Sequence, residues 1–173
     1  MSRVKTIIIF ISLFYFISNI PIARLLDEDV APMNYIIDNI YLGGILAAEN
    51  EHYLDQYNIG FVVNCAEEIH IKYKKRQVYA LNLEDTETQK IFPIFELAYR
   101  IIKKFRNRNI LVHCAAGMSR SASLVIFYLM KEKGWNYDQC FKYVKERRSV
   151  ISPNDGFEKQ LRDYYEKHFK NGN

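Results

Sequence analysis

The sequence of 173 residues contains few cysteines, glycines and prolines. Its three cysteines are widely spaced and odd in number, so they match neither a disulfide framework nor the CxxC spacing of a zinc site. Seven glycines and four prolines are too few for a collagen-like repeat or a low-complexity chain. We therefore interpret Cys65, Cys114 and Cys140 as reduced thiols, and we expect neither a metal nor another cofactor.

A strong charge of one sign is also missing. The chain has 24 basic and 20 acidic residues, and the net charge of +4 is too small to indicate nucleic-acid binding, although it suits an anionic substrate. In contrast, 13 tyrosines, 11 phenylalanines and a hydrophobic fraction of 49% supply enough apolar material for one core. This composition excludes disorder and predicts a single globular domain without a nucleic-acid partner.

Residues 6–23 form an uncharged, largely apolar stretch between Lys5 and Arg24. Its length is at the lower edge of a membrane span, which needs about 17–25 apolar residues. Three interpretations stay open: a membrane anchor, a cleaved signal, or a helix that packs on the domain. Because an acidic stretch that ends near Pro32 reads as a linker, we assign residues 1–33 to this hydrophobic segment and linker, and residues 34–173 to the domain.

From residue 34 onward, β-rich segments alternate with helical ones. Strands are predicted at 35–42, 61–65, 78–83 and 110–112. Helices are predicted at 46–57, 92–106 and 121–133, with Gly134 closing the third. Two more follow, one capped by Asn136 and one starting at Ser152-Pro153, with predicted inner faces of Tyr137, Cys140, Phe141 and Val144, and of Phe157, Leu161, Tyr164 and His168. This order predicts an α/β domain with a central, mostly parallel sheet flanked by helices, and a ligand site beyond the carboxyl ends of its strands.

The chemistry is concentrated in residues 113–121, HCAAGMSRS, between a predicted buried strand and a predicted buried helix. Cys114 is expected to face the amino end of that helix, which favours the nucleophilic thiolate form. The small residues after it allow backbone N–H groups to converge on an anion, and Arg120 can add a bidentate contact. The predicted phosphate-binding set is Ala115, Ala116, Gly117, Met118, Ser119 and Arg120.

This stretch resembles the HCxxGxxR[S/T] signature of the cysteine-based protein tyrosine phosphatases. The serine-rich version, followed by YLM at 128–130, is most similar to the dual-specificity phosphatases. The resemblance covers about residues 34–169: it includes the strand at 35–43 and the pattern Pro153-Asn154-x-Gly156-Phe157-x-x-Gln160-Leu161 of the family's last helix. It implies a protein-tyrosine-phosphatase-like fold. Phe127 departs from the alanine that often precedes YLM.

The resemblance implies a two-step mechanism. Cys114 attacks phosphorus and forms a phosphocysteine, while Arg120 and the loop N–H groups bind the phosphoryl oxygens. Ser121 stabilises Cys114 as a leaving group, and His113 tunes the thiolate through hydrogen bonds. Asp85, on the loop after the strand at 78–83, is the expected general acid.

The roles of Cys65 and of the basic run at 72–76 each have two possible interpretations. Cys65, at the end of a predicted strand, is either a core cysteine or the partner of Cys114 in a reversible disulfide of the kind that some superfamily relatives form. The basic run at 72–76 is either a solvated face or a patch that attracts acidic phosphosubstrates.

The implied function is hydrolysis of phosphotyrosine and phosphoserine or phosphothreonine in a phosphoprotein substrate. The alternatives are a phosphoinositide or RNA 5′-triphosphate phosphatase with the same nucleophile, and a non-catalytic phosphoprotein-binding module. We expect residues 6–23 to associate the chain with a membrane, and reduced-thiol chemistry predicts that the catalytic domain then faces the cytosol. The few flanking charges favour the opposite topology, and a soluble cytoplasmic form is the alternative. The sequence does not predict the oligomeric state.

Overall fold

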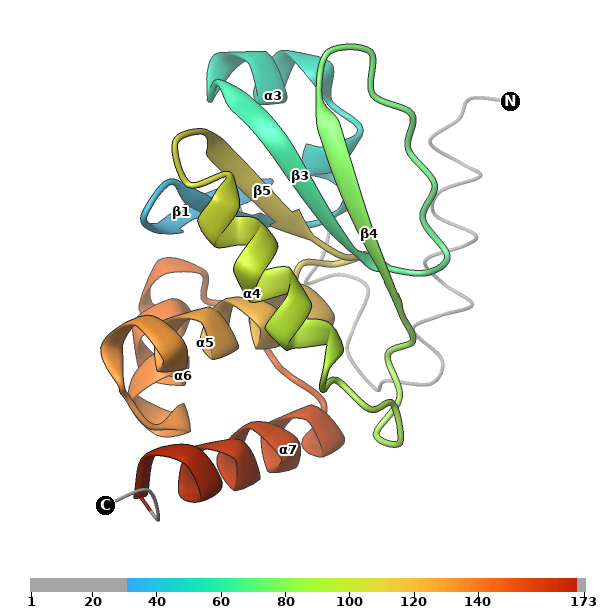
Figure 1. Ribbon diagram of the computed structural model, residues 1–173. Coiled ribbons are helices and arrows are strands. Elements are labelled where there is room, and N and C mark those ends of the chain that lie inside the picture. The colour runs from blue at the N-terminus through green and yellow to red at the C-terminus, as the bar shows by residue number, and fades with distance from the viewer. Residues whose placement is uncertain (1–30, 171–173) are drawn as a thin grey trace. The chain divides into compact units, whose positions relative to one another are not determined.

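The computed structural model describes residues 31–170, which are built around one five-stranded sheet (Figure 1). Its strands are β1 (Met33–Ile37), β2 (Ile40–Gly43), β3 (Ile59–Ala66), β4 (Gln77–Leu83) and β5 (Asn109–His113). They lie in the order β1-β2-β5-β3-β4, and only the β1–β2 pair is antiparallel. The mostly parallel sheet is confirmed, and the carboxyl end of β5 lies at its centre.

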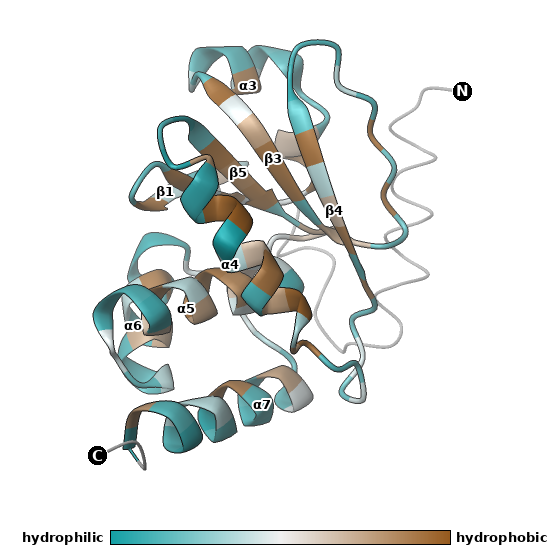
Figure 2. Cartoon of the chain, viewed as in Figure 1, coloured by the Kyte–Doolittle hydropathy of each residue, from teal (hydrophilic) through white to brown (hydrophobic). Residues whose placement is uncertain are grey.

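Helices cover both faces of the sheet. The segments α2 (Ile45–Ala48) and α3 (Glu51–Gln56) pack with the smaller core cluster. The larger cluster lies on the other face beneath α4 (Ile94–Lys104), α5 (Arg120–Lys133), α6 (Tyr137–Arg147) and α7 (Asp155–Tyr165), and a π-helical turn, η2 (Glu166–Lys170), follows α7. Alternation along β5 explains the two layers, since Ile110 and Val112 enter the larger cluster and Leu111 enters the smaller one. Figure 2 shows the resulting apolar strands.

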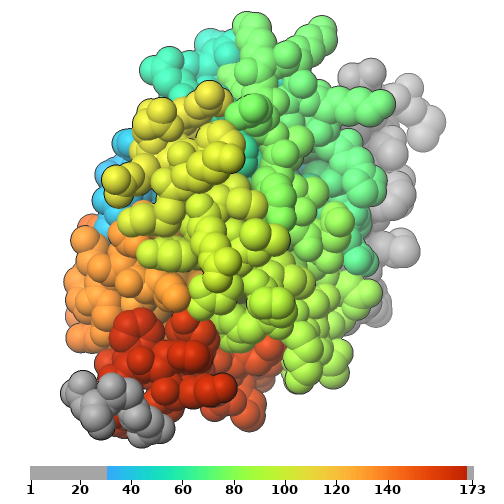
Figure 3. Space-filling model, in the orientation of Figure 1, coloured from blue at the N-terminus to red at the C-terminus, as the bar shows by residue number. Residues whose placement is uncertain are grey.

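The helix α5 is the centre of the larger layer. Its side chains from Arg120 to Met130 are all buried, and Gly134 ends it in the left-handed conformation with φ of 66°. This confirms the predicted central helix and its glycine stop. The space-filling view shows α4 (yellow-green) and α7 (red) next to each other on the visible face (Figure 3). The Tyr164 hydroxyl of α7 donates a 2.6 Å hydrogen bond to Glu96 of α4.

Two predicted segments are interrupted. Residues 35–42 form a hairpin instead of one strand, because Asp38 and Asn39 adopt positive φ values of 47° and 66° and turn the chain back. Residues 46–57 form two short helices instead of one. The break falls at Asn50, which has extended backbone and caps α3 by accepting a hydrogen bond from the Tyr53 N–H at 3.2 Å.

The last helix differs from its prediction at both ends. It begins at Asp155, after the cap Asn154, and not at Ser152-Pro153. Phe157 and Leu161 face the core as predicted. His168 is exposed instead of inward, with its ring stacked 4.3 Å from that of Tyr164.

The predicted membrane segment at 6–23 lies outside the described residues. Within residues 31–170, no helix combines the length and the apolar character that a membrane crossing requires.

Candidate active site

The strand β5 delivers Cys114 to the centre of the sheet's carboxyl edge, and a short loop then leads into α5. Cys114 is only 2% exposed. Its Sγ accepts a 3.2 Å hydrogen bond from the Ser121 hydroxyl, which is fully buried in the first turn of α5. The structure therefore brings the predicted nucleophile and the predicted helper serine into direct contact.

Four successive carbonyl groups of the loop accept hydrogen bonds from residues outside it. The Ala115 carbonyl accepts from the Ile45 N–H at 2.9 Å, and the Met118 carbonyl accepts from the Ser152 N–H at 2.9 Å. Between them, the carbonyls of Ala116 and Gly117 both accept from the Arg148 guanidinium, at 3.2 and 2.9 Å. In a planar trans peptide, the carbonyl and the following N–H point in opposite directions. The next four N–H groups therefore point toward the interior of the loop, which is the arrangement of an anion-binding nest.

Glycine is required where this loop packs on the end of β2. Gly117 has φ of +70°, and a Cβ there would lie 2.4 Å from the carbonyl carbon and oxygen of Gly43. A Cβ on Gly44 would lie 2.9 Å from the Ala115 carbonyl oxygen. Both the backbone conformation and the close approach exclude a side chain at Gly117.

Arg148 is a supporting residue that the sequence did not single out. It follows α6, is 4% exposed, and donates to Asn34 Oδ1 at 2.8 Å in addition to its two loop carbonyls. Burial lowers the pKa of Arg148, and the charge of Cys114 acts in the opposite direction. The guanidinium thus ties the loop after Cys114 to β1.

Arg120 is 1% exposed and is held on two sides. Its two terminal nitrogens donate to the Glu68 carboxylate at 2.6 and 2.7 Å, and one of them also reaches the Leu83 carbonyl at 3.0 Å. Its Nε lies 3.5 Å from Asp85 Oδ2. Burial alone would lower the pKa of Arg120, but the bonds to Glu68 and the nearby negative charges raise it overall, so the residue is a permanent cation.

Glu68 is the second residue that the sequence did not single out. Burial alone would raise its pKa, but the hydrogen bonds and charge of Arg120 hold that pKa below the ordinary value. The residue comes just after β3, and ligands bind beyond the carboxyl ends of parallel strands. Its position after a parallel strand was therefore the sequence signal that could have identified Glu68 as a site residue.

Asp85 follows β4 and reaches the loop as predicted. Its Oδ1 accepts hydrogen bonds from the Ser119 hydroxyl at 2.6 Å and from Asn154 Nδ2 at 2.9 Å. Its side chain is 22% exposed, so a bound molecule can reach the carboxyl group. The general-acid candidate therefore lies beside both the loop and Arg120.

His113 contacts the backbone of Cys114. Its Nδ1 lies 3.3 Å from the Cys114 carbonyl oxygen, and the tuning of the thiolate through hydrogen bonds stays a prediction. Complete burial lowers the pKa of His113 to about 4, so the ring is neutral at physiological pH. Its described hydrogen bond orients the backbone at Cys114.

All three cysteines are free thiols and buried, as interpreted from the sequence. Burial, assisted by the charge of Cys114, raises the pKa of Cys65 well above its ordinary value. Cys65 therefore stays a protonated thiol at neutral pH. Its place in the larger core cluster fits the interpretation as a core cysteine, and the reversible disulfide with Cys114 stays untested.

The basic run at 72–76 has a partly structural role. The Arg76 side chain is 4% exposed, donates to the Ile59 carbonyl at 2.9 Å, and forms ion pairs with Glu51 and Asp55 of α3. It braces the loop against that helix and does not face solvent. Lys72, Lys74 and Lys75 are the exposed cations that a substrate patch would use, and Lys75 also lies 3.5 Å from Asp55.

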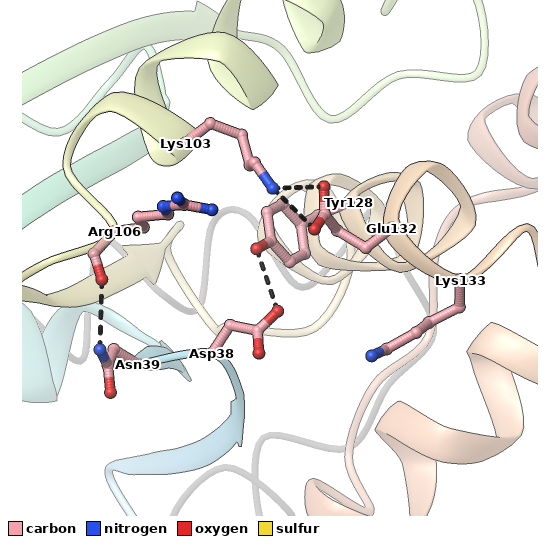
Figure 4. A pocket seen from close by; sticks show the side chains of 7 residues that line it. All are labelled: Asp38, Asn39, Lys103, Arg106, Tyr128, Glu132 and Lys133. Carbon is pink, nitrogen blue, oxygen red and sulfur yellow. Dashed lines mark hydrogen bonds and ion pairs between the residues drawn. The ribbon is translucent and has the colours of Figure 1, made fainter.

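A cavity of about 440 Å³ lies at the opposite end of α5 (Figure 4). Its lining residues are Asp38, Asn39, Lys103, Arg106, Tyr128, Glu132 and Lys133. Lys103 pairs with Glu132 at 2.7 Å, and the Tyr128 hydroxyl donates to Asp38 at 3.2 Å. No cysteine lines this cavity. Among residues 31–170, no three His, Cys, Asp or Glu side chains gather in a way that could hold a metal ion.

Known proteins share this architecture. A family model described as "Dual specificity phosphatase, catalytic domain" matches residues 40–167. A probable rhodanese domain-containing dual specificity protein phosphatase of Dictyostelium discoideum is 40% identical over 136 residues, which are 77% of this chain and 29% of that protein. Dual specificity protein phosphatase 1 of Arabidopsis thaliana is 33% identical over 147 residues, which are 83% of this chain and 74% of that protein.

A solved structure of a tyrosine phosphatase-like protein has the same fold as this chain. The human tyrosine phosphatase-like serine/threonine/tyrosine-interacting protein superimposes with a TM-score of 0.70 at 29% identity, over 76% of this chain and 94% of that one. The chain spans less than a third of the length of several curated relatives that it matches. An activity must therefore be argued from the side chains at the site.

Proposed function

This chain belongs to the dual specificity phosphatase family, and on that premise we propose that it hydrolyses phosphate monoesters of tyrosine and of serine or threonine in phosphoproteins. One observation carries the proposal. Cys114, its hydrogen-bonding partner Ser121, the buried cation Arg120 and the carboxyl group of Asp85 converge on one loop whose carbonyl groups are bonded away from its interior. A phosphate-binding module without catalysis needs neither the thiol nor the acid.

Binding of the phosphate is the first task of the site. The inward N–H groups of the loop and the Nε edge of Arg120 supply donors for the phosphoryl oxygens. Glu68 holds the two terminal nitrogens of Arg120, so the guanidinium plane is fixed before a substrate arrives. Fixed donors stabilise the transition state more than mobile ones, because they need no reorganisation as charge shifts to the oxygens.

The first chemical step transfers the phosphoryl group to sulfur. The Cys114 thiolate attacks phosphorus in line, a P–S bond forms, and the bond from phosphorus to the side-chain oxygen breaks. Asp85 gives its proton to that leaving oxygen. The products of this step are the dephosphorylated side chain and a phosphocysteine.

The second step hydrolyses the phosphocysteine. Water attacks phosphorus, the Asp85 carboxylate takes its proton, and the P–S bond breaks to release inorganic phosphate. Ser121 donates to Cys114 Sγ and stabilises the departing thiolate. Cys114 and Asp85 are then restored to their starting forms.

Breadth of substrate follows from the size of the domain. Classical tyrosine-specific domains of this superfamily are much larger and carry an extra loop that deepens the pocket. Residues 34–173 have no obvious room for such a loop. A shallow pocket admits the shorter phosphoserine and phosphothreonine as well as phosphotyrosine.

The test uses the full chain in EDTA with four substrates: a phosphotyrosine peptide, a phosphothreonine peptide, a phosphoinositide and a 5′-triphosphate RNA. Turnover of both peptides is expected, with complete loss in Cys114→Ser and strong reduction in Asp85→Asn. Cys140→Ser, which also replaces a buried thiol but in α6, is the matched control and keeps activity. Turnover of only the lipid or the RNA contradicts the substrate class, and no turnover of any substrate leaves a binding module.

We also propose that residues 6–23 attach the chain to a membrane with the catalytic domain facing the cytosol. The uncharged stretch and the need of a thiolate enzyme for a reducing compartment support this proposal. Cells expressing the full chain and a chain lacking 6–23 are fractionated and extracted with alkaline carbonate. The full chain is expected in the extracted membranes, and the deletion in the supernatant. Equal distribution of the two chains contradicts the anchor.

A further inference from the structure

The start of α7 is fastened to the segment at 85–91. Gly156 lies so close to this segment that a Cβ there would be 2.0 Å from the Glu87 carbonyl oxygen. One turn later, Gln160 Nε2 donates to the Gln89 carbonyl at 2.9 Å. Asn154, Gly156 and Gln160 are the polar and glycine positions of the pattern at 153–161. All three contact residues 85–91, the segment that carries the proposed general acid.

Asn154, Ser119 and Asp85 form a closed ring of hydrogen bonds. The Asn154 backbone N–H donates to Ser119 Oγ at 3.2 Å, and Ser119 Oγ donates to Asp85 Oδ1 at 2.6 Å. The Asn154 Nδ2 donates to the same Oδ1 at 2.9 Å and closes the ring. The orientation of the amide is fixed, because Asn154 Oδ1 accepts from the Phe157 N–H at 2.9 Å and a backbone N–H can only donate.

This ring distinguishes the two oxygens of Asp85. Oδ1 accepts from two donors, so a proton on Oδ1 would compete with both. Oδ2 lies outside the ring, on the side of Arg120, with its Nε 3.5 Å away. A phosphate bound at the Nε edge of Arg120 therefore brings its leaving oxygen close to Oδ2.

We propose that Asn154 and Ser119 are positioning residues that direct the catalytic proton of Asp85 onto Oδ2. The inference rests on the proposed function, in which Asp85 is the general acid. In the first step the Oδ2–H bond breaks, the proton moves to the leaving oxygen, and the electron pair of that O–H bond stays on Oδ2. The same electrons accept the proton of water in the second step. Oδ1 remains bonded to Ser119 and Asn154 throughout.

Leaving-group dependence tests this positioning. Phenyl phosphate needs a proton on its departing oxygen, whereas 2,4-dinitrophenyl phosphate does not. In the full chain we compare kcat/KM, which reports the first chemical step alone and not the hydrolysis of the phosphocysteine that both esters share. Asn154→Ser and Ser119→Ala are expected to lower kcat/KM for phenyl phosphate by roughly 10- to 100-fold and kcat/KM for the dinitrophenyl ester by less than about threefold. Serine still caps α7 but lacks the amide that reaches Asp85.

The matched control is Asn136→Ser, the same substitution at the N-cap of α6, which is expected to change neither rate. A second readout is the double variant Ser119→Ala with Asp85→Asn. If Ser119 acts through Asp85, the double variant is no slower on phenyl phosphate than Asp85→Asn alone. Because Ser119→Ala keeps the loop backbone and the α7 cap, it reports on the ring even if Asn154→Ser is unstable.

Equal loss with both esters, no loss with either, or a fully additive double variant would overturn the positioning role. Failure of the proposed function looks different. In that case Asp85→Asn itself shows no preference between the two esters, or the unaltered chain hydrolyses neither of them.

Discussion

Replacing Gly156 by alanine is expected to slow catalysis without unfolding the chain. Gly156 is in the first turn of α7, and the methyl group would lie 2.0 Å from the Glu87 carbonyl oxygen and 2.5 Å from the Glu87 Cα. An ordinary van der Waals contact begins at 3.4 Å, so the helix and the segment after Asp85 must separate by about 1.4 Å. The neighbouring atoms are backbone, so no side chain can rotate away.

The size of each effect follows from this displacement. A shift of about 1 Å in a catalytic group costs roughly 100-fold in rate, and this loss applies to substrates that need the proton of Asp85. Stability changes less. Alanine gains about 1 kcal/mol over glycine inside a helix, whereas overpacking costs about 1–3 kcal/mol. The net loss of about 0–2 kcal/mol leaves the chain folded.

The assay compares kcat/KM of Gly156→Ala with phenyl phosphate and with 2,4-dinitrophenyl phosphate, alongside a thermal melt. The control is Gly60→Ala in β3, where the three atoms nearest to the new methyl group all belong to the Arg108 side chain, at 3.2 Å and beyond. An unchanged rate with phenyl phosphate would show that α7 does not set the position of Asp85. Equal losses with both esters would show that the substitution damages the nucleophile loop instead.

Three further predictions concern the residues around Cys114. Glu68→Gln is expected to lower kcat/KM by roughly 5- to 30-fold, because the Arg120 guanidinium loses a charge-assisted partner; an unchanged value would remove Glu68 from the site. His113 has a pKa of about 4 in the folded chain and about 6.5 when unfolded, so the unfolded chain binds more protons between these values. Folding stability is therefore complete above about pH 6.5 and falls by up to about 3 kcal/mol toward pH 4, and denaturant titrations of His113→Asn should lack this slope. Peroxide is expected to oxidise Cys114 without linking it to Cys65, because burial keeps the Cys65 thiol protonated; a peptide map with a disulfide between them would establish the reversible bond instead.

The fold was predictable wherever an apolar pattern ran unbroken through one element. The central helix α5 contains an unbroken apolar run at 124–130 and ends at a glycine, so its location and burial followed from the sequence pattern. The errors share another cause. Asp38-Asn39, Asn50 and Asn154 each interrupt or delay an element whose apolar pattern continues across them. Short polar side chains that tolerate left-handed backbone or cap a helix mark such boundaries, and periodicity does not detect them.

The candidate site was predictable in the parts that are contiguous in the chain. Cys114, Arg120 and Ser121 share one loop and one helix start, and Asp85 follows the edge strand β4 of the same sheet. The contacts that hold these groups join distant segments. The position of Glu68 after β3 places it at the ligand-binding edge of the sheet, but it does not specify Arg120 as the partner. That pairing depends on how β3 and β5 lie side by side.

The nest shows why the loop motif alone does not make the site. Backbone N–H groups converge on an anion only if the carbonyl groups of the same peptides are directed elsewhere, and each buried carbonyl needs a donor. Those donors come from the start of α2, from Arg148 after α6 and from the segment before α7. A chain that kept residues 113–121 but lost Arg148 would leave two loop carbonyls without their donor and free to rotate inward, against the phosphate. The capacity to bind an anion at this loop is therefore a property of the whole domain.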